Sequence, residues 1–288
     1  MAVREYLERI REGVKVWNHW RSLHADLRGL DLSAADLSAV DLRDINLSYA
    51  NLRGTSFRYT GLQGASFRGA DLSMANLGKS SPIGADFSHA HLSMANLSSA
   101  CLSSADFRYA DLRGSNLADA DFTASDFRYA NLSLCNLQRA NLSLVNLLGA
   151  NLTRADLRQC DAVAADFSRA SLNEANLSGS NLSEALLVGT EAIAANFADA
   201  VLNEANLTRS NLIGMNGQRA SLCACDAIAA DFTGADFTDA DFTGADLSRA
   251  NFTWAVGLQP GQWQRCQLFG TVDAKGKLQT HTETQPPG

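Results

Sequence analysis

The sequence predicts an all-β solenoid, in which the chain coils around a narrow core and turns a corner every five residues. From Leu27 to Phe252, every fifth residue is Leu or Phe at 41 of 46 positions. The residue two places earlier is Ala in 30 of these 46 units, and no insertion or deletion breaks the register. A period of five matches neither the 3.6 residues of a helix nor the alternation of a strand. A coil with five-residue sides places both the large and the small residue inside, where close packing requires one of the two to be small.

Phenylalanine positions indicate how many sides each coil has. Phe67, Phe87, Phe107, Phe127 and Phe167 differ by multiples of 20, and residues 106–110 and 126–130 share the sequence Asp-Phe-Arg-Tyr-Ala. Four sides per coil would place like residues above one another, and we expect the Phe rings to stack. Forty-six units then give about 11.5 coils, or roughly 55 Å at ~4.8 Å per coil.

The unit Ala-(Asp/Asn)-Leu-X-X, as in Ala35-Asp36-Leu37 and Ala95-Asn96-Leu97, resembles the motif of the pentapeptide-repeat family. The resemblance covers about residues 25–256 and implies a right-handed quadrilateral parallel β-helix. The segment from Glu5 through Trp17 to Arg21 also resembles leader segments of cyanobacterial members, which implies a bacterial, cytosolic protein.

Both ends of the chain depart from the repeat, so we expect three parts. Residues 1–24 carry apolar side chains at helical spacing, which predicts one amphipathic helix that caps the first coil or, alternatively, docks a partner or a second copy. Residues 25–256 form the β-helix. Residues 257–288 form a C-terminal cap with a hairpin over 263–280 that turns near 273–276, followed by a disordered tail over 280–288.

Two residues interrupt the core pattern. Pro82 cannot donate a backbone hydrogen bond, which predicts a local bulge around residues 80–84. Gly217 stands where a Leu is expected, which predicts a missing side chain in the core.

Composition excludes several classes of protein. No apolar run approaches the ~20 residues of a membrane span, and we find no signal peptide, so we expect neither a membrane nor a secreted protein. The net charge of −7 argues against direct nucleic-acid binding. Six cysteines without a Cys-x-x-Cys pair indicate reduced, structural thiols and a cytoplasmic protein. Because no nucleophile–base arrangement, phosphate loop or metalloprotease motif is present, we expect no enzyme and no cofactor.

A polar corner offers a weak candidate metal site. His89 and His91 flank the inward Ala90, and Asp71 and Asp111 would lie one coil to either side of His91. Imidazole and carboxylate groups together can hold a transition metal. The alternative is an ordinary polar surface.

Acidic residues are concentrated late in the repeat. Residues 43–170 have a net charge of +1, whereas residues 171–256 have −8. Within the acidic half, five aspartates at repeat positions fall into about one coil: Asp226, Asp231, Asp236, Asp241 and Asp246. The family resemblance implies one role for such a surface, because some quinolone-resistance members are thought to mimic DNA and occupy gyrase. The alternative is an acidic surface that keeps the protein soluble.

The side that carries the Phe series offers a second surface. Its outward positions include Tyr49, Tyr109 and Tyr129 with Arg68, Arg108 and Arg128. Tyr and Arg are enriched at interface hot spots. Asp86, Asp106 and Asp126 lie on the same side, so ion pairing is the structural alternative. We therefore expect a non-catalytic scaffold or interaction module with an unknown protein partner, and a homodimer through one end is plausible.

Overall fold

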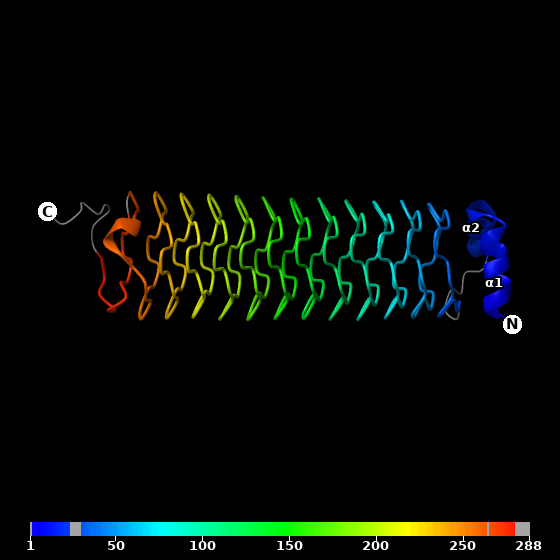
Figure 1. Ribbon diagram of the computed structural model, residues 1–288, viewed down its shortest axis with the longest axis horizontal. Helices are drawn as coiled ribbons and strands as arrows, with labels where there is room; N and C mark the ends of the chain where they lie inside the picture. The colour runs from blue at the N-terminus through cyan, green and yellow to red at the C-terminus, as the bar shows by residue number, and fades with distance from the viewer. Residues whose placement is uncertain (1, 24–29, 264, 280–288) are drawn as a thin grey trace. The chain divides into compact units, whose positions relative to one another are not determined.

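The computed structural model describes residues 2–23, 30–263 and 265–279, and it divides the chain into two compact units, Met1–Asn141 and Leu142–Gly288. Two helices open the first unit, α1 (Ala2–Arg11) and α2 (Val14–Leu23). A 3-10 helix, η1 (Pro260–Trp263), lies late in the second unit. Most of the other described residues of each unit form stacked turns of backbone (Figure 1). The tail predicted over 280–288 lies outside the described residues.

Each unit is built from parallel β-bridges that join residues 20 positions apart. In the first unit they begin with Asp31 and Asn51 and continue to Asp121 and Asn141. In the second unit they begin with Asn146 and Asp166 and reach Asp236 and Val256. The 20-residue coil with four sides is therefore confirmed within each unit, and the right-handed winding stays a prediction.

One side of a coil shows why the five-residue motif folds in this way. The backbone N–H of Leu72 donates to the carbonyl of His91 in the next coil, at 2.6 Å. The chain then turns, Met74 adopts a φ of 61°, and the N–H of Ala75 donates back to the carbonyl of Leu72. The Asp71 carboxylate accepts the N–H of Ser73 at 2.9 Å and so fixes the turn. This side-chain cap explains the preference for Asp or Asn before each Leu, which the sequence analysis left unexplained.

The large and small repeat positions form the core, as predicted. Leu72, Ala75 and Leu77 are fully buried, and the equivalent positions of both units are buried except at Val40, which is 37% exposed. In the first unit the Phe rings stack, with centroid distances of 4.9 Å from Phe67 to Phe87, 4.7 Å from Phe87 to Phe107 and 4.5 Å from Phe107 to Phe127. The expected stacking of like residues in successive coils is thereby confirmed.

The bulge predicted at Pro82 is wrong. Gly61 still bridges Ser81, and Cys101 bridges Asp121, so the 20-residue register continues on both sides of Pro82. The proline side chain is buried in the Leu position of the motif. Its effect is limited to one hydrogen bond, because Pro82 has no N–H to donate to the next coil.

The gap predicted at Gly217 is also wrong. A Cβ at this position would lie 2.8 Å from the ring of Phe237 and 3.3 Å from Cε of Met215. Met215 is a large residue at the small inward position. Together these two side chains fill the space that a leucine would occupy.

The N-terminal segment forms two helices instead of the predicted single helix. Gly13, with a φ of 114°, separates α1 from α2 and permits a sharp change of direction. Trp17 of α2 is fully buried, and its Nε1–H donates to the carbonyl of Asn46 at 2.9 Å. The Asn18 side chain donates to the carbonyl of Asp44 at 2.7 Å and accepts the N–H of Asn46 at 2.9 Å. Asn18 therefore satisfies the backbone groups of residues 44 and 46, as a neighbouring strand would.

The coil continues past residue 256, where the sequence analysis ended it. Asp246 bridges Gln267 and Asn251 bridges Val272, at a spacing of 21 residues, so the segment containing η1 adds one residue to the coil. An antiparallel bridge then joins Val272 to Leu278 around a turn at Asp273–Gly276.

Candidate interaction surface

Side chains at the coil corners point along the stack toward the following coil. The second residue of each turn has a φ near +60°, as in Tyr49 (59°) and Met94 (58°). The Tyr49 ring lies 2.7 Å from the position that a Cβ atom would occupy on Gly69, one coil on. The sulfur of Met94 likewise lies 2.8 Å from the Cβ position of Gly114. Corner residues 20 positions apart therefore form continuous columns on the surface.

One column of the first unit is aromatic and exposed. This aromatic column consists of His89, Tyr109 and Tyr129, with ring centroids 5.1 and 5.3 Å apart and planes within 14° of parallel. Tyr109 and Tyr129 are 54% and 53% exposed. Tyr49, predicted as part of this set, belongs to the same corner but rests on Gly69 instead of another ring.

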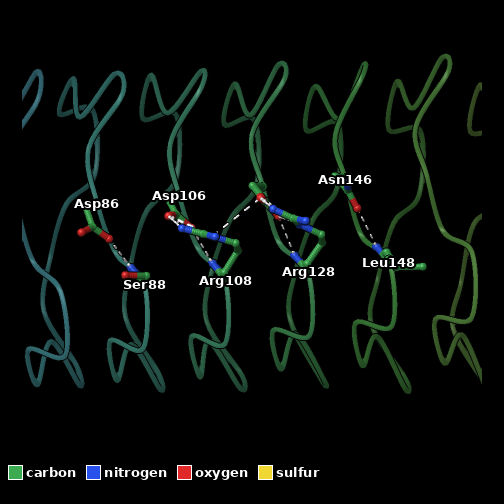
Figure 2. Close-up of polar contacts among 8 residues, drawn as sticks. Asp86, Ser88, Asp106, Arg108, Arg128, Asn146 and Leu148 are labelled. Carbon is green, nitrogen blue, oxygen red and sulfur yellow. Dashed lines mark hydrogen bonds and ion pairs between the residues drawn. The ribbon is translucent and has the colours of Figure 1, made fainter.

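The predicted arginines beside the aromatic column are held in ion pairs. Figure 2 shows Arg108 and Arg128 each folded back on the aspartate two residues earlier. Nη2 of Arg108 lies 2.6 Å from Oδ2 of Asp106, and Nη2 of Arg128 lies 2.6 Å from Oδ2 of Asp126. Nε of Arg108 also lies 3.8 Å from Asp126 of the next coil. These contacts favour the structural alternative for Arg108 and Arg128.

The series of Asp–Arg ion pairs at residues 106–108 and 126–128 does not extend to Arg68. Arg68 follows Ser66 instead of an aspartate, and its exposed guanidinium makes no ion pair with the residues that the structure describes. The carboxylate of Asp86 accepts the N–H of Ser88 at 2.8 Å. The hydrogen bonds that Arg108 donates to the Asp106 carboxylate raise the pKa of Arg108 and keep its charge fixed.

A second exposed column, which the sequence analysis missed, lies at the next corner of the same unit. It contains Met74, Met94 and Leu134, which are 59%, 68% and 53% exposed. The face between the two columns carries Asp71, His91 and Asp111. The signal was present in the sequence as three apolar side chains at one corner position, spaced by multiples of 20.

The candidate metal residues lie along one face and at its neighbouring corner. His91 bridges Asp71 on one side and Asp111 on the other, as expected. His89, however, stacks on Tyr109. Burial raises the pKa of Asp71, but hydrogen bonds from Ser73 and the charges of His91 and Arg53 outweigh it and hold the pKa below its usual value. Among the described residues, no group of three or more His, Cys, Asp or Glu side chains is arranged to hold a metal ion.

The five acidic residues of the second unit lie on four different sides of the coil. Asp226 bridges Asp246 on one side, and Asp231, Asp236 and Asp241 occupy the other three. Four of these carboxylates accept a backbone N–H two residues on, at Thr233, Thr238, Thr243 and Ser248. Asp236 also accepts the Gln218 amide, which with the Thr238 bonds lowers its pKa. The acidic residues therefore fix turns, and they extend over about one coil of ~5 Å.

Buried thiols and open pockets do not combine into a reactive site among the described residues. Burial raises the pKa of Cys135 and Cys160 to about 12, so both remain protonated. An open pocket of about 320 Å³ lies among Leu258, Trp263 and Leu268 in the second unit. Another of about 550 Å³ lies between the turn at Gly13 and residues 41–44.

Comparison with protein families decides the identity of the repeat. The profile described as pentapeptide repeats matches segments that together cover residues 35–216 and 218–253. The chain belongs to the pentapeptide repeat family. A comparison with curated protein sequences gave no match.

Solved structures of other pentapeptide repeat proteins are similar to the chain. HetL, involved in heterocyst differentiation regulation in the cyanobacterium Nostoc sp. strain PCC 7120, is 28% identical over 90% of this chain and 97% of its own, with a TM-score of 0.44. QnrB1, a plasmid-mediated fluoroquinolone resistance protein, is 19% identical over 57% of this chain and 88% of its own, with a TM-score of 0.30. A protein from the thylakoid lumen of Arabidopsis thaliana is 32% identical over 41% of this chain and 68% of its own, with a TM-score of 0.23. Within the described residues of this pentapeptide repeat protein, no helix is long and apolar enough to cross a membrane.

Proposed function

We propose that this pentapeptide repeat protein is a non-catalytic protein-interaction module, and that the aromatic column of the first unit is its docking surface. The observation that carries the proposal is the exposed stack of His89, Tyr109 and Tyr129. Half of each tyrosine surface meets solvent, whereas the Leu and Phe side chains at the repeat positions of this unit are buried. Tyrosine offers a partner a large contact area at a low entropic cost, because it has two rotatable bonds.

The coil beneath makes this surface rigid. Each ring is held at a corner whose backbone pairs with the next coil, as in the N–H of His89 with the carbonyl of Arg108 at 2.9 Å. Arg108 and Arg128, locked in ion pairs, support the aromatic column from the adjacent face. A partner therefore meets a surface that loses little freedom on binding, which favours affinity.

Affinity capture with matched variants tests the proposal. The bait proteins are the wild type, Tyr109→Glu and Tyr59→Glu. Tyr59 is the control because it has the same φ region and 55% exposure but lies at a different corner. We expect a partner that mass spectrometry detects with the wild type and with Tyr59→Glu but not with Tyr109→Glu. Loss of the same partner from both variants would contradict the proposal.

We also propose a reducing compartment, the cytoplasm, because all six cysteines are unpaired thiols. The DNA-mimic alternative predicts inhibition of purified gyrase that is relieved when Asp226, Asp231, Asp236, Asp241 and Asp246 are changed to Asn. If purified gyrase is inhibited in this way and the inhibition does not depend on Tyr109, these five aspartates, and not the aromatic column, form the functional surface.

A further inference from the structure

One corner of the second unit repeats with a period of two coils. The two turn residues at this corner alternate between an apolar–small pair and a hydroxyl–arginine pair. In order they are Leu148-Gly149, Ser168-Arg169, Val188-Gly189, Thr208-Arg209, Ile228-Ala229, Ser248-Arg249 and Phe269-Gly270. The N–H of the second residue of each pair donates to the carbonyl of the first residue of the next, at 2.9–3.0 Å throughout. The seven pairs therefore form one continuous column, which we call the arginine stripe.

The small residues make room for the arginine side chains. Cγ of Arg169 lies 4.0 Å from where a Cβ on Gly189 would stand, and Cγ of Arg249 lies 3.5 Å from the same point on Gly270. Each of these two aliphatic stems thus lies along the corner over the following glycine, whereas Arg209 is followed by Ala229. Arg169, Arg209 and Arg249 are all exposed.

These three arginines differ from the other coil arginines of the unit. Arg154 pairs with Glu174, Arg158 with Asp156, and Arg219 with Asp199, at 3.5, 2.7 and 2.6 Å. No ion pair within 4.0 Å joins Arg169, Arg209 or Arg249 to any residue that the structure describes.

Carboxylates lie beside the arginine stripe without pairing to it, and among them Asp226, on the same face as Asp246, makes no ion pair within 4.0 Å with a described residue. Asp166 and Asp246 accept the N–H groups of Ser168 and Ser248, each at 2.9 Å. Glu191, on the adjoining face, accepts the side-chain amide of Asn211 at 2.8 Å. Because no described carboxylate lies within 4.0 Å of these three guanidinium groups, an external anion can pair with them.

Apolar side chains lie between the arginines. Leu148, Val188 and Ile228 are half-buried, and Phe269 is 53% exposed. Leu186, two residues before Val188, adds an exposed leucine where the motif places Asp or Asn. The arginine stripe thus offers charge and apolar contact in strict alternation.

The spacing identifies a partner. Two coils advance about 9.6 Å, and seven residues of an α-helix advance about 10.5 Å. The six steps from Leu148 to Phe269 cover roughly 29 Å, the length of a helix of about 20 residues. The flexible arginine side chains can absorb the difference of about 1 Å per repeat.

We propose that the arginine stripe binds an amphipathic α-helix of a partner protein that carries Asp or Glu every seventh residue and apolar residues three or four positions from each acid. Carboxylates of the helix pair with Arg169, Arg209 and Arg249, and its apolar residues contact Val188, Ile228 and Leu186. The proposal rests on residues of the second unit alone and does not depend on the docking role proposed for the aromatic column.

Charge favours a helix over a nucleic acid or polyphosphate. Residues 142–288 contain 9 basic and 16 acidic side chains, a net charge of −7. A DNA duplex carries a phosphate about every 1.7 Å, so most of its charges would have no arginine opposite them, in a unit whose net charge is negative. A helix with one acid per heptad places negative charge only near the arginines.

Fluorescence anisotropy with designed peptides tests the proposal on the full-length protein. The probe is a labelled 21-residue helical peptide with Glu at i, i+7 and i+14 and Leu at i+3 and i+4 of each heptad. The control peptide has the same composition with Glu moved to i, i+5 and i+10. We expect the heptad peptide to bind at least tenfold more tightly than the control peptide.

Matched variants separate the arginine stripe from general charge. Changing Arg169, Arg209 and Arg249 together to Gln should weaken binding of the heptad peptide at least tenfold. Changing Arg154, Arg158 and Arg219 to Gln removes the same charge elsewhere and should change binding less than twofold. Circular dichroism confirms that both variants remain folded.

Several outcomes would overturn the proposal. Equal binding of the two peptides, or equal losses in the two triple variants, would show that spacing is irrelevant. Tighter binding of a DNA duplex or polyphosphate, lost in the stripe variant, would assign the stripe to a polyanion. Concentration-dependent self-association in sedimentation, lost in the stripe variant, would assign it to a second copy of the chain.

Discussion

The ring of Phe237 lies over Gly217, and a Cβ added to that glycine would come within 2.8 Å of it. The glycine departs from the repeat consensus because the next coil supplies the missing volume. Restoring the consensus at this position would therefore overpack the core.

We predict that Gly217→Leu destabilises the protein by about 1–3 kcal/mol, the usual cost of overpacking. The double variant Gly217→Leu/Phe237→Leu should recover most of that loss, because it returns both coils to the common leucine. Urea denaturation followed by circular dichroism measures the effect. Stabilisation by Gly217→Leu alone would show that the position is a cavity.

The stacked phenylalanines of the first unit should contribute strongly to stability. Phe107 is fully buried between Phe87 and Phe127. Phe107→Ala should cost about 3–5 kcal/mol, whereas Phe107→Leu keeps the repeat motif and should cost less. Thermal denaturation of both variants checks the order, and equal losses would remove any special role for the stack.

Asn18 should protect the first described coil from opening. Asn18→Ala removes the bonds to the Asp44 carbonyl and the Asn46 N–H, and we expect a loss of about 1–3 kcal/mol. Asn18→Asp keeps an acceptor for Asn46 but has no donor for Asp44, so its loss should be intermediate. Hydrogen exchange at the Asn46 amide reports the change, and unaltered exchange in Asn18→Ala would contradict a capping role for α2.

Acid should destabilise the coils. Hydrogen bonds from the side chain and backbone of the residue two places ahead hold the pKa of Asp31, Asp36 and Asp241 below the usual value. A lowered folded-state pKa contributes stability above the unfolded pKa of about 3.9, and this stability is lost as the pH falls through the folded value. The urea concentration at the midpoint of unfolding should therefore decrease when the pH is lowered below about 4. Asp241→Asn keeps an acceptor for Thr243, so its midpoint should fall less over the same range.

Periodicity alone predicted the core of the fold, and packing between coils explains what it missed. The positions of Leu72, Ala75 and Phe107 follow from a period of five with four sides. Pro82 and Gly217 were misjudged because each was read within its own coil, whereas the register and Phe237 of the neighbouring coil decide the outcome. The break at Gly13 was missed because a helical spacing of apolar residues on both sides of the glycine conceals it.

Surface positions were predicted less completely than the core. The sequence placed Tyr109, Tyr129, Arg108 and Arg128 on one surface, and the structure divides them into a stacked pair and two ion-paired side chains. It also separates the five acidic positions from Asp226 to Asp246 onto four sides. The direction of side chains along the corners, visible in Tyr49 over Gly69, depends on a positive φ that the repeat motif does not reveal.

Engineered disulfides test the 20-residue coil most directly. Ser93 Oγ lies 3.3 Å from Ser73 Oγ one coil away, so Ser73→Cys/Ser93→Cys in a Cys101→Ser background should form a disulfide under mild oxidation. The pair Ser73→Cys/Ser88→Cys, three sides apart, should stay reduced under the same conditions. A disulfide in the second pair but not in the first would contradict four five-residue sides per coil.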